Sequence, residues 1–300
     1  MIGVELKKVK LSNGETIAYR ERPGKGSERV DTKPILLIHG NMTSSQHWDL
    51  VFEEMDEKYH LIAPDVRGFG ESSYINPINS FDDLADDFAE FYEKIELQSA
   101  HVVAWSTGGG VGMNLAVKYP EKIESLTLLC SLSTRGYPFF LLDEKGQPIK
   151  RIETREELKQ DSWRTIPIEK AYREKDWDML KGIWKQVVYT NKEPEETRYD
   201  VYLNEMCKQR NLVDIYYIND RFNISLQNGG TGEVETITAP VLILEGEQDK
   251  LVFPAMTSEI REDFGGRASY HLLKGCGHSP LVDDLDQLIE VVTLFVEKHS

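Results

Sequence analysis

Short apolar runs alternate with amphipathic segments along the first 131 residues of the chain. Four of these runs are bounded by turn residues: "PILLIHG", "YHLIAPD", "AHVVAWS" and "IESLTLLCS", which begin at residues 34, 59, 100 and 123. Continuous apolar runs of this length are typical of strands that are buried on both faces. Helical spacing extends between them over about residues 45–58, 81–97 and 109–118. Strand and helix therefore alternate, which predicts a parallel sheet built from βαβ units.

A hairpin precedes this pattern, and two more strands follow it after a long interruption. Asn13 and Gly14 lie between two alternating segments, residues 4–11 and 16–20, and predict a β-hairpin because both residues tolerate positive φ. The strand pattern returns at "PVLILEGE" from residue 240 and "ASYHLLKG" from residue 268, before a last helix over about residues 281–297. These segments complete a set of eight predicted strands, and the interruption follows the sixth.

The interruption is rich in aromatic residues and has a helical pattern of its own. Within residues 132–236, Trp177, Leu180, Trp184 and Val188 follow helical spacing. We predict a helical cap whose apolar side lies on one edge of the sheet. The chain then divides into an N-terminal part of the core (residues 1–131), the cap (132–236) and a C-terminal part of the core (237–300).

Charge and cysteine content narrow the classes of function. The chain has 35 basic and 51 acidic residues, a formal net charge of -16. Phosphates and anionic lipids would be repelled, so neither nucleic acid nor a membrane is expected as a partner. Cys130, Cys207 and Cys276 have no C-x-x-C spacing, which argues against a disulfide framework or a zinc site. Because no run reaches the length of a membrane span or a signal peptide, we expect a cytoplasmic protein.

The stretch "HVVAWSTGGGVG", residues 101–112, permits two chemical interpretations. A dinucleotide-binding loop needs G-x-G-x-x-G after a strand, but a pattern that starts at Gly108 places Met113 where the last glycine should be. A nucleophile elbow needs small residues two positions before and after the nucleophile, and Ala104 and Gly108 flank Ser106 in this way. Taken alone, Ser106 could also be a helix N-cap. The elbow is favoured because the rest of the sequence meets its further requirements.

A nucleophilic serine needs a base and a carboxylate that orients the base. Asp249 directly follows the strand in "VLILEGEQD", and His278 follows the next strand in "LLKGCGHSP". The chain order is then Ser106, Asp249, His278, as an elbow on a parallel sheet requires. Asp249 is preferred because it lies past the strand. Other carboxylates that could take its place lie within the strand or in the cap: Glu245, Glu247, Asp214 and Asp220.

Backbone N–H groups are expected to hold the oxyanion that forms when the serine attacks. One would come from Thr107, directly after the nucleophile, and a second from Asn41 in the loop "HGNMTSSQHW", with Met42 as the alternative. No H-x-H-x-D-H or H-E-x-x-H spacing occurs, so a metal-dependent mechanism has no support in the sequence. The expected chemistry needs no cofactor and no metal.

Five motifs in order, "LLIHGN", "PDVRGFGES", "AWSTGG", "LEGEQD" and "GCGHSP", resemble those of the α/β-hydrolase superfamily over nearly the whole chain outside the cap. The resemblance implies an α/β-hydrolase fold: a mostly parallel eight-stranded sheet flanked by helices, with a helical cap inserted after the sixth strand. The loop "HGNMTSSQHW" is similar to that of haloalkane dehalogenases. Those enzymes attack with an aspartate, so Ser106 argues against dehalogenation and epoxide opening.

Together these features predict a serine hydrolase of carboxylesterase or lactonase type. Its expected partner is a small, largely apolar ester or lactone, cleaved by Ser106, His278 and Asp249 through an acyl-enzyme. The same triad and cap occur in carbon-carbon bond hydrolases, in cofactor-free perhydrolases and in receptor-like proteins that bind a ligand with little turnover. Proline iminopeptidases fit less well, since their elbow resembles G-G-S-W-G-G.

Overall fold

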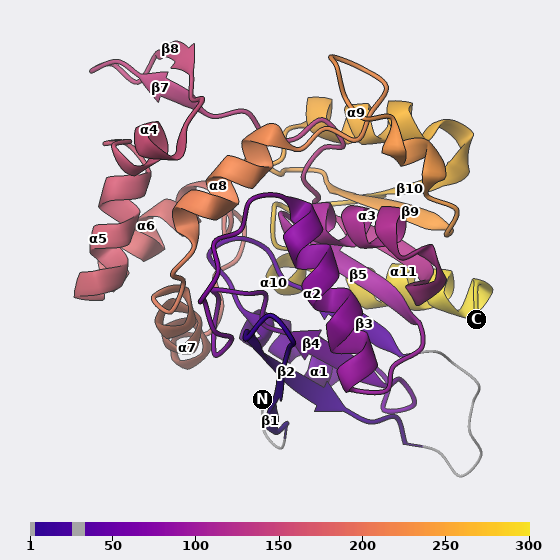
Figure 1. The fold of residues 1–300 in the computed structure, drawn as a ribbon. Coiled ribbons are helices and arrows are strands. Elements are labelled where there is room, and N and C mark those ends of the chain that lie inside the picture. Colours follow the sequence, from indigo (N-terminus) through magenta and orange to yellow (C-terminus); the bar gives the residue numbers. More distant parts are fainter. Residues whose placement is uncertain (1–3, 26–33) are drawn as a thin grey trace.

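The eight-stranded sheet is present in the computed structural model, which describes residues 4–25 and 34–300 (Figure 1). Residues 1–3 of the predicted N-terminal core part lie outside the described residues, as do residues 26–33. In chain order the strands are β1 (Leu6–Lys10), β2 (Thr16–Arg22), β3 (Ile35–Ile38), β4 (Leu61–Pro64), β5 (Ala100–Trp105), β6 (Ile123–Leu129), β9 (Val241–Gly246) and β10 (Ala268–Leu273).

The strands lie in the order β1-β2-β4-β3-β5-β6-β9-β10 across the sheet. Neighbours from β4 to β10 pair in parallel, whereas β2 runs antiparallel to both β1 and β4. The expected mostly parallel sheet is therefore confirmed, and so is the hairpin, in which β1 and β2 flank Asn13 and Gly14.

Helices cover both faces of the sheet because its central strands are apolar on both sides. Along β3, Ile35 and Leu37 pack into one core while Leu36 and Ile38 pack into another, since side chains alternate along a strand. The first core includes side chains of α1 (Asp49–Glu54), α10 (Pro280–Asp283) and α11 (Leu285–Lys298). The second includes side chains of α2 (Phe81–Lys94), α3 (Gly108–Lys118) and α9 (Pro254–Phe264).

Two of the expected helices are interrupted. Residues 45–58 form a 3-10 turn, η1 (Ser45–Trp48), followed by the short α1. The last helix begins as α10, and Asp284, with φ -154°, separates it from α11. The carboxylate of Asp284 accepts the N–H of Gln287 at 3.1 Å, and the Ser44 hydroxyl caps η1 in the same way. Such side chains favour the start of a helix at these positions, because they accept a backbone N–H that has no partner within the helix.

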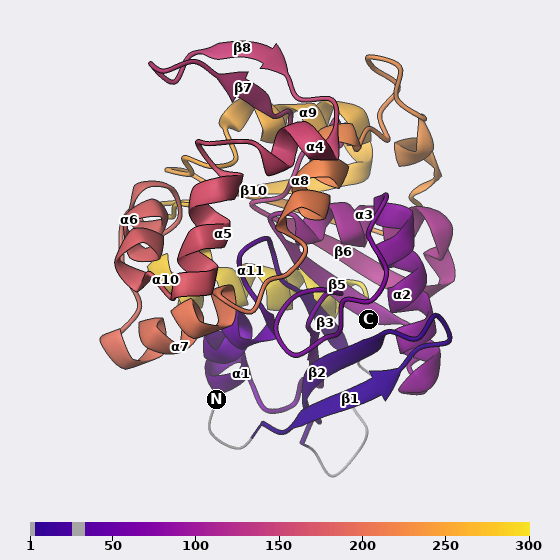
Figure 2. The same cartoon turned by 60° about the vertical axis from the view of Figure 1, so that its left-hand side comes forward.

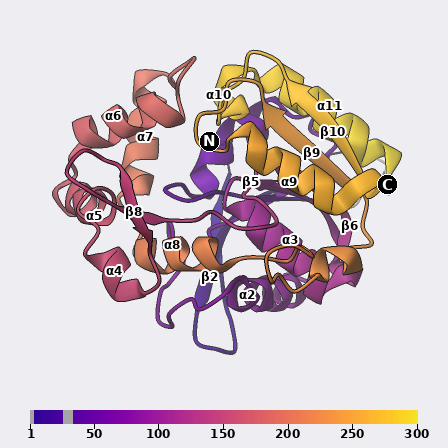
Figure 3. The same ribbon diagram turned by 90° about the horizontal axis from the view of Figure 1, so that it is seen from above.

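The segment between β6 and β9 forms a separate layer, as Figures 2 and 3 show. Its helices are α4 (Arg155–Lys159), α5 (Thr165–Glu174), α6 (Trp177–Val187), α7 (Glu196–Met206) and α8 (Leu212–Arg221). The helical insertion after the sixth strand is thus confirmed. Of the spaced residues, Trp177, Leu180 and Trp184 lie in α6, and Val188 is its C-cap. A small hairpin of β7 (Phe140–Leu142) and β8 (Pro148–Arg151), which the sequence did not predict, precedes the helices. The remaining 3-10 turns are η2 (Pro120–Lys122), η3 (Glu233–Thr236) and η4 (Gly265–Arg267).

Helix α7 fastens this layer to the core through buried polar contacts. Arg198 and the hydroxyl of Tyr202 both donate to the carboxylate of Asp49, at the start of α1. The Tyr202 ring also stacks on the buried ring of His47, with 4.3 Å between centroids. No helix in the described part of the chain is long and apolar enough to cross a membrane.

Candidate active site

Ser106 lies on a sharp turn between β5 and α3. Its backbone has φ +57°, a left-handed conformation that costs energy for a residue with a side chain. The turn fits only because small residues surround it. A Cβ on Gly108 would lie 2.6 Å from the carbonyl oxygen of His39, and one on Gly40 would lie 2.9 Å from Cβ of Ser106. The hydroxyl is therefore held at the end of the strand, as the elbow interpretation requires.

The structure brings Ser106, His278 and Asp249 together from three separate loops. Nε2 of His278 lies 3.0 Å from Oγ of Ser106, and Nδ1 lies 2.8 Å from Oδ2 of Asp249. The other oxygen of Asp249 accepts the backbone N–H groups of Leu251 at 2.8 Å and Val252 at 2.9 Å. The His278 and Asp249 side chains are each 2% exposed. This arrangement can pass a proton from the serine to an imidazole whose orientation the carboxylate fixes.

The alternative carboxylates are engaged elsewhere. Glu245 accepts from the Tyr270 hydroxyl at 2.8 Å, and Glu247 accepts the N–H of Gly275 at 2.8 Å. In the insertion, the carboxylates pair with arginines: Asp214 with Arg155 at 2.8 Å, and Asp220 with Arg151 at 3.2 Å. Asp249 is thus the carboxylate that lies against His278.

Trp105 is a residue of this site that the sequence reasoning missed. Its indole N–H donates to the backbone oxygen of His278 at 2.8 Å, and its ring centroid is 5.9 Å from that of the imidazole. A buried tryptophan needs a partner for its N–H, and the position directly before the serine could have indicated this role. Trp105 therefore ties the histidine loop to the strand that positions Ser106.

Asn41 and Thr107 line the same pocket as Ser106. Their backbone N–H groups have no hydrogen-bond acceptor within residues 4–25 and 34–300. Contacts within the loop fix the backbone around Asn41. The Thr43 hydroxyl donates to the carbonyl of Gly40 at 2.6 Å, and Met42 has φ +58°. Both predicted N–H groups are thus free to bind an oxyanion.

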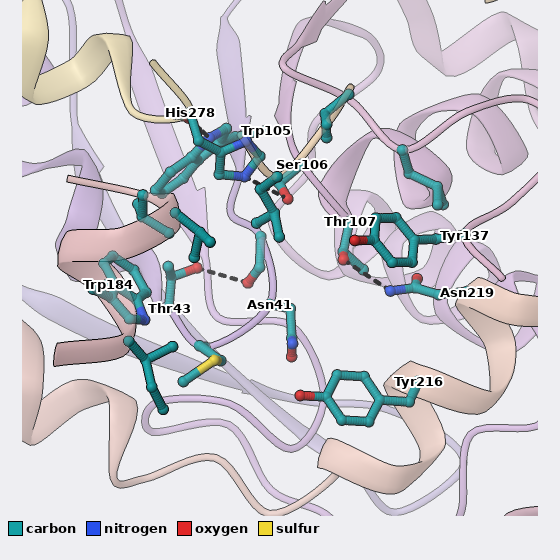
Figure 4. A pocket seen from close by; sticks show the side chains of 18 of the residues that line it. Asn41, Thr43, Trp105, Ser106, Thr107, Tyr137, Trp184, Tyr216, Asn219 and His278 are labelled. Atoms are coloured by element: carbon teal, nitrogen blue, oxygen red, sulfur yellow. Dashed lines mark hydrogen bonds between the residues drawn. The ribbon is translucent and has the colours of Figure 1, made fainter. Parts of the chain in front are cut away.

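The pocket in front of Ser106 has a volume of about 240 Å³ and lies between the sheet and the insertion (Figure 4). Among the aromatic residues of the insertion, Phe139 and Trp184 line it. Phe140 and Trp163 are instead 37% and 48% exposed. The lining also includes Tyr137, Tyr216 and Asn219, and apolar side chains from α6 and from the loop after Asp249.

One group of potential metal ligands coincides with this site. Ligand atoms of Cys130, Asp249 and His278 all lie within 4.8 Å of one another. Burial raises the pKa of the Cys130 thiol, which disfavours its thiolate form in the protein alone. The pKa of the nearby Cys276 is raised to about 12, again because of burial. Neither shift favours a nucleophilic thiolate at these positions.

Comparison with known proteins identifies the family and the fold of the chain. The family model described as alpha/beta hydrolase fold matches residues 33–285. Lipase 3 of Moraxella sp. (strain TA144) is 26% identical over 289 residues, which cover 93% of this chain and 81% of the lipase. A haloalkane dehalogenase of Bradyrhizobium diazoefficiens is 32% identical over 116 residues, 39% of this chain and 36% of that protein. The structure of an esterase from Exiguobacterium antarcticum has a TM-score of 0.73 at 16% identity, and the match covers 97% of this chain and 99% of that one.

Proposed function

Because this chain belongs to the α/β-hydrolase family, we propose that it is a serine hydrolase that cleaves a carboxylic ester or lactone. The observation that carries the proposal is the unbroken chain of contacts from Ser106 Oγ through His278 to Asp249, which opens into a mostly apolar pocket. Relatives that include a lipase support an ester as the substrate.

In the first half of the reaction, Oγ of Ser106 attacks the carbonyl carbon while Nε2 of His278 takes the hydroxyl proton. Asp249 stabilises the imidazolium that results and holds its tautomer. The carbonyl electron pair moves to oxygen, and the N–H groups of Asn41 and Thr107 bind that oxyanion. Each such donor contributes on the order of 10² to 10³ in rate. When the carbonyl re-forms, the bond to the alkoxy oxygen breaks and His278 gives its proton to the leaving oxygen.

In the second half, water takes the place of the alcohol. His278 removes a proton from the water, whose oxygen attacks the acyl carbon, and collapse of the second oxyanion releases a carboxylic acid and returns the proton to Ser106. With a lactone, the alcohol and the acid remain one molecule, so the product is a hydroxy acid. No step needs a cofactor.

The insertion closes the pocket over the serine, and we take residues 132–236 as the cap of the enzyme. Trp184 of α6 and Phe139 of the segment before β7 form apolar parts of its wall. An apolar wall favours the acyl chain of the substrate over water. We therefore expect a small, largely apolar acyl group.

The first test follows proton release by the purified protein with a panel of short and long acyl esters and several lactones. Ser106→Ala should remain folded, as circular dichroism would show, and should lose at least 99.9% of the activity, roughly the loss of 10³ or more that follows removal of a nucleophile. Retention of more than a few per cent, in a preparation free of other esterases, would refute the assignment. No turnover of any ester or lactone by the folded wild type would favour carbon-carbon cleavage or ligand binding instead.

A further inference from the structure

Helix α8 presents to the pocket a polar group that the proposed mechanism does not use. Asn219 is 6% exposed, and its Nδ2 donates to the hydroxyl of Thr107 at 3.1 Å. Its Oδ1 is buried and has no hydrogen-bond partner among the residues that the structure describes. Buried carbonyl oxygens are nearly always hydrogen-bonded, because removal from water without a partner is costly. The fold leaves the hydrogen-bonding capacity of this oxygen unmet, and a turn of the buried amide toward the pocket would present it to a donor on a bound molecule.

Two tyrosine hydroxyls accompany Asn219 on the same side of the pocket. Figure 4 shows Tyr137 and Tyr216 with their rings reaching into the pocket beside Asn219. Neither hydroxyl has a hydrogen-bond partner in the described ranges. Burial raises the pKa of both phenols, so they stay neutral and can donate or accept. We call Tyr137, Tyr216 and Asn219 the polar wall.

The opposite side of the pocket is apolar. Figure 4 shows Trp184 of α6 across the pocket from Tyr137 and Asn219, and Ile183 and Val187 of the same helix also line the pocket. A molecule that fills the pocket thus meets hydrogen-bonding groups on one side and hydrocarbon on the other. This division suits a substrate whose polar substituent lies apart from its acyl chain.

The charge in the pocket lining does not select an anion. Arg164 is the cation among the lining residues, but its Nε lies 2.6 Å from the buried carboxylate of Asp161, and its Nη2 donates to the carbonyl of Phe140. Asp161 therefore neutralises the guanidinium. The polar wall itself consists of neutral groups, which suits a neutral hydrogen-bonding substituent.

We propose that the polar wall is a subsite for a hydroxyl or amide N–H carried on the carbon next to the scissile carbonyl, with Asn219 Oδ1 as the acceptor. The position is inferred from two observations: Asn219 contacts the side chain of Thr107, the residue after Ser106, and all three residues line the same pocket. The rest of the acyl chain lies against α6. This inference rests on the proposed hydrolase function and names its substrate class: α-hydroxy or α-amido esters and lactones.

The test compares kcat/KM for methyl hexanoate, each enantiomer of methyl 2-hydroxyhexanoate and each enantiomer of methyl 2-methoxyhexanoate. The hydroxyl can donate to Asn219, whereas the methoxy group fills similar space and cannot. We expect one hydroxy enantiomer to exceed methyl hexanoate by about tenfold and the methoxy esters to show no gain, because a site built around a hydrogen bond discriminates against an analogue that lacks the donor. Equal values for the hydroxy ester and methyl hexanoate, or a gain for the methoxy ester as large as for the hydroxy ester, would overturn the proposal.

Two variants locate the preference on the polar wall. Asn219→Leu removes the acceptor and should bring the ratio of hydroxy to parent ester close to one, whatever its effect on the rate itself. Tyr217→Phe is the matched control on the same helix, since the Tyr217 ring lies against Arg155 and Arg221, at 4.0 and 4.6 Å, and does not line the pocket. It should keep the wild-type ratio. An unchanged ratio in Asn219→Leu would contradict the role of Asn219.

Failure of the inference and failure of the hydrolase function give different results. Hydrolysis of methyl hexanoate that is lost in Ser106→Ala, without any preference for the hydroxy ester, would overturn only the polar wall. If the wild type hydrolyses none of the esters, the hydrolase function fails, and calorimetric binding to Ser106→Ala still decides the inference. Tighter binding of the hydroxy ester than of methyl hexanoate would then support the polar wall, and equal binding would refute it.

Discussion

The close approach of Gly40 to Ser106 shows how little space the nucleophile has. A Cβ at Gly40 would lie 2.9 Å from Cβ of Ser106 and 3.2 Å from the carbonyl oxygen of Trp105. Neither neighbour can rotate away, because one belongs to the strained elbow and the other to β5. The glycine therefore sets the distance between the oxyanion loop and the serine.

Gly40→Ala should lower kcat on the order of a hundredfold, because displacement of reacting groups by about 1 Å can cost that much. The matched control is Gly182→Ala on the exposed side of α6, where an added Cβ meets no atom within 4 Å. This change should leave kcat unaltered and raise the free energy of unfolding by roughly 0.5 to 1 kcal/mol, since glycine weakens a helix. Esterase kinetics and urea unfolding measure the two effects. Similar kcat values for both variants would contradict the steric argument.

In the proposed mechanism, Trp105 would act on the reaction through its contact with His278, as a positioning residue. Trp105→Phe keeps a ring in the core but removes the N–H that binds the His278 carbonyl. We expect kcat to fall about tenfold with KM changed less than twofold, because orientation of the base matters in the transition state. Steady-state kinetics on one ester measures the split. A rise in KM with kcat intact would indicate a role in substrate binding instead.

At the scale of elements, α7 joins the cap to the core through a ring stack that depends on a neutral histidine. Burial holds the pKa of His47 well below its ordinary value of 6.5, and the nearby His39 contributes in the same direction. His47 stays uncharged in the fold, whereas the unfolded chain takes up a proton near pH 6.5. The neutral ring therefore contributes stability above pH 6.5 that is lost as the pH falls below it.

His47→Phe should reduce the pH dependence of stability. Below about pH 6.5 the wild type should lose up to about 1.4 kcal/mol per pH unit more than the variant, which cannot be protonated at this position. Urea unfolding of both proteins at pH 7.5, 6.5 and 5.5 measures the difference. Parallel pH profiles for the two proteins would show that His47 is not the group responsible.

The elements that the sequence predicted are those whose signal is local. Buried strands appear in the sequence as continuous apolar runs, and the glycines around Ser106 indicate the elbow. The break between α10 and α11 was missed although Asp284 and Gln287 form a recognisable capping pair. Contacts such as Asn219 with Thr107 join residues far apart in the chain. No local pattern encodes such a contact, so the sequence alone does not show which residues of the cap face the pocket.

At the scale of the whole molecule, the formal net charge of -16 repels anions at long range. An ester that bears a carboxylate should therefore show a lower kcat/KM than a neutral ester of the same length at low ionic strength. The gap should narrow with added salt, because a Debye length of about 10 Å at 0.1 M screens the field. Kinetics at 10 and 300 mM salt test this expectation. An equal response of both esters to salt would contradict it.

Strands β6 and β9 are hydrogen-bonded neighbours in the sheet, although the whole insertion separates them along the chain. The ladder from Leu126 and Val241 to Leu129 and Leu244 is continuous without any residue of the insertion. Because the pairing does not depend on the insertion, evolution can replace the insertion with another segment. The sheet, the elbow and the histidine loop would then remain unaltered. Replacement of this one segment would then change the substrate preference, while the residues around Ser106 and His278 stay in place.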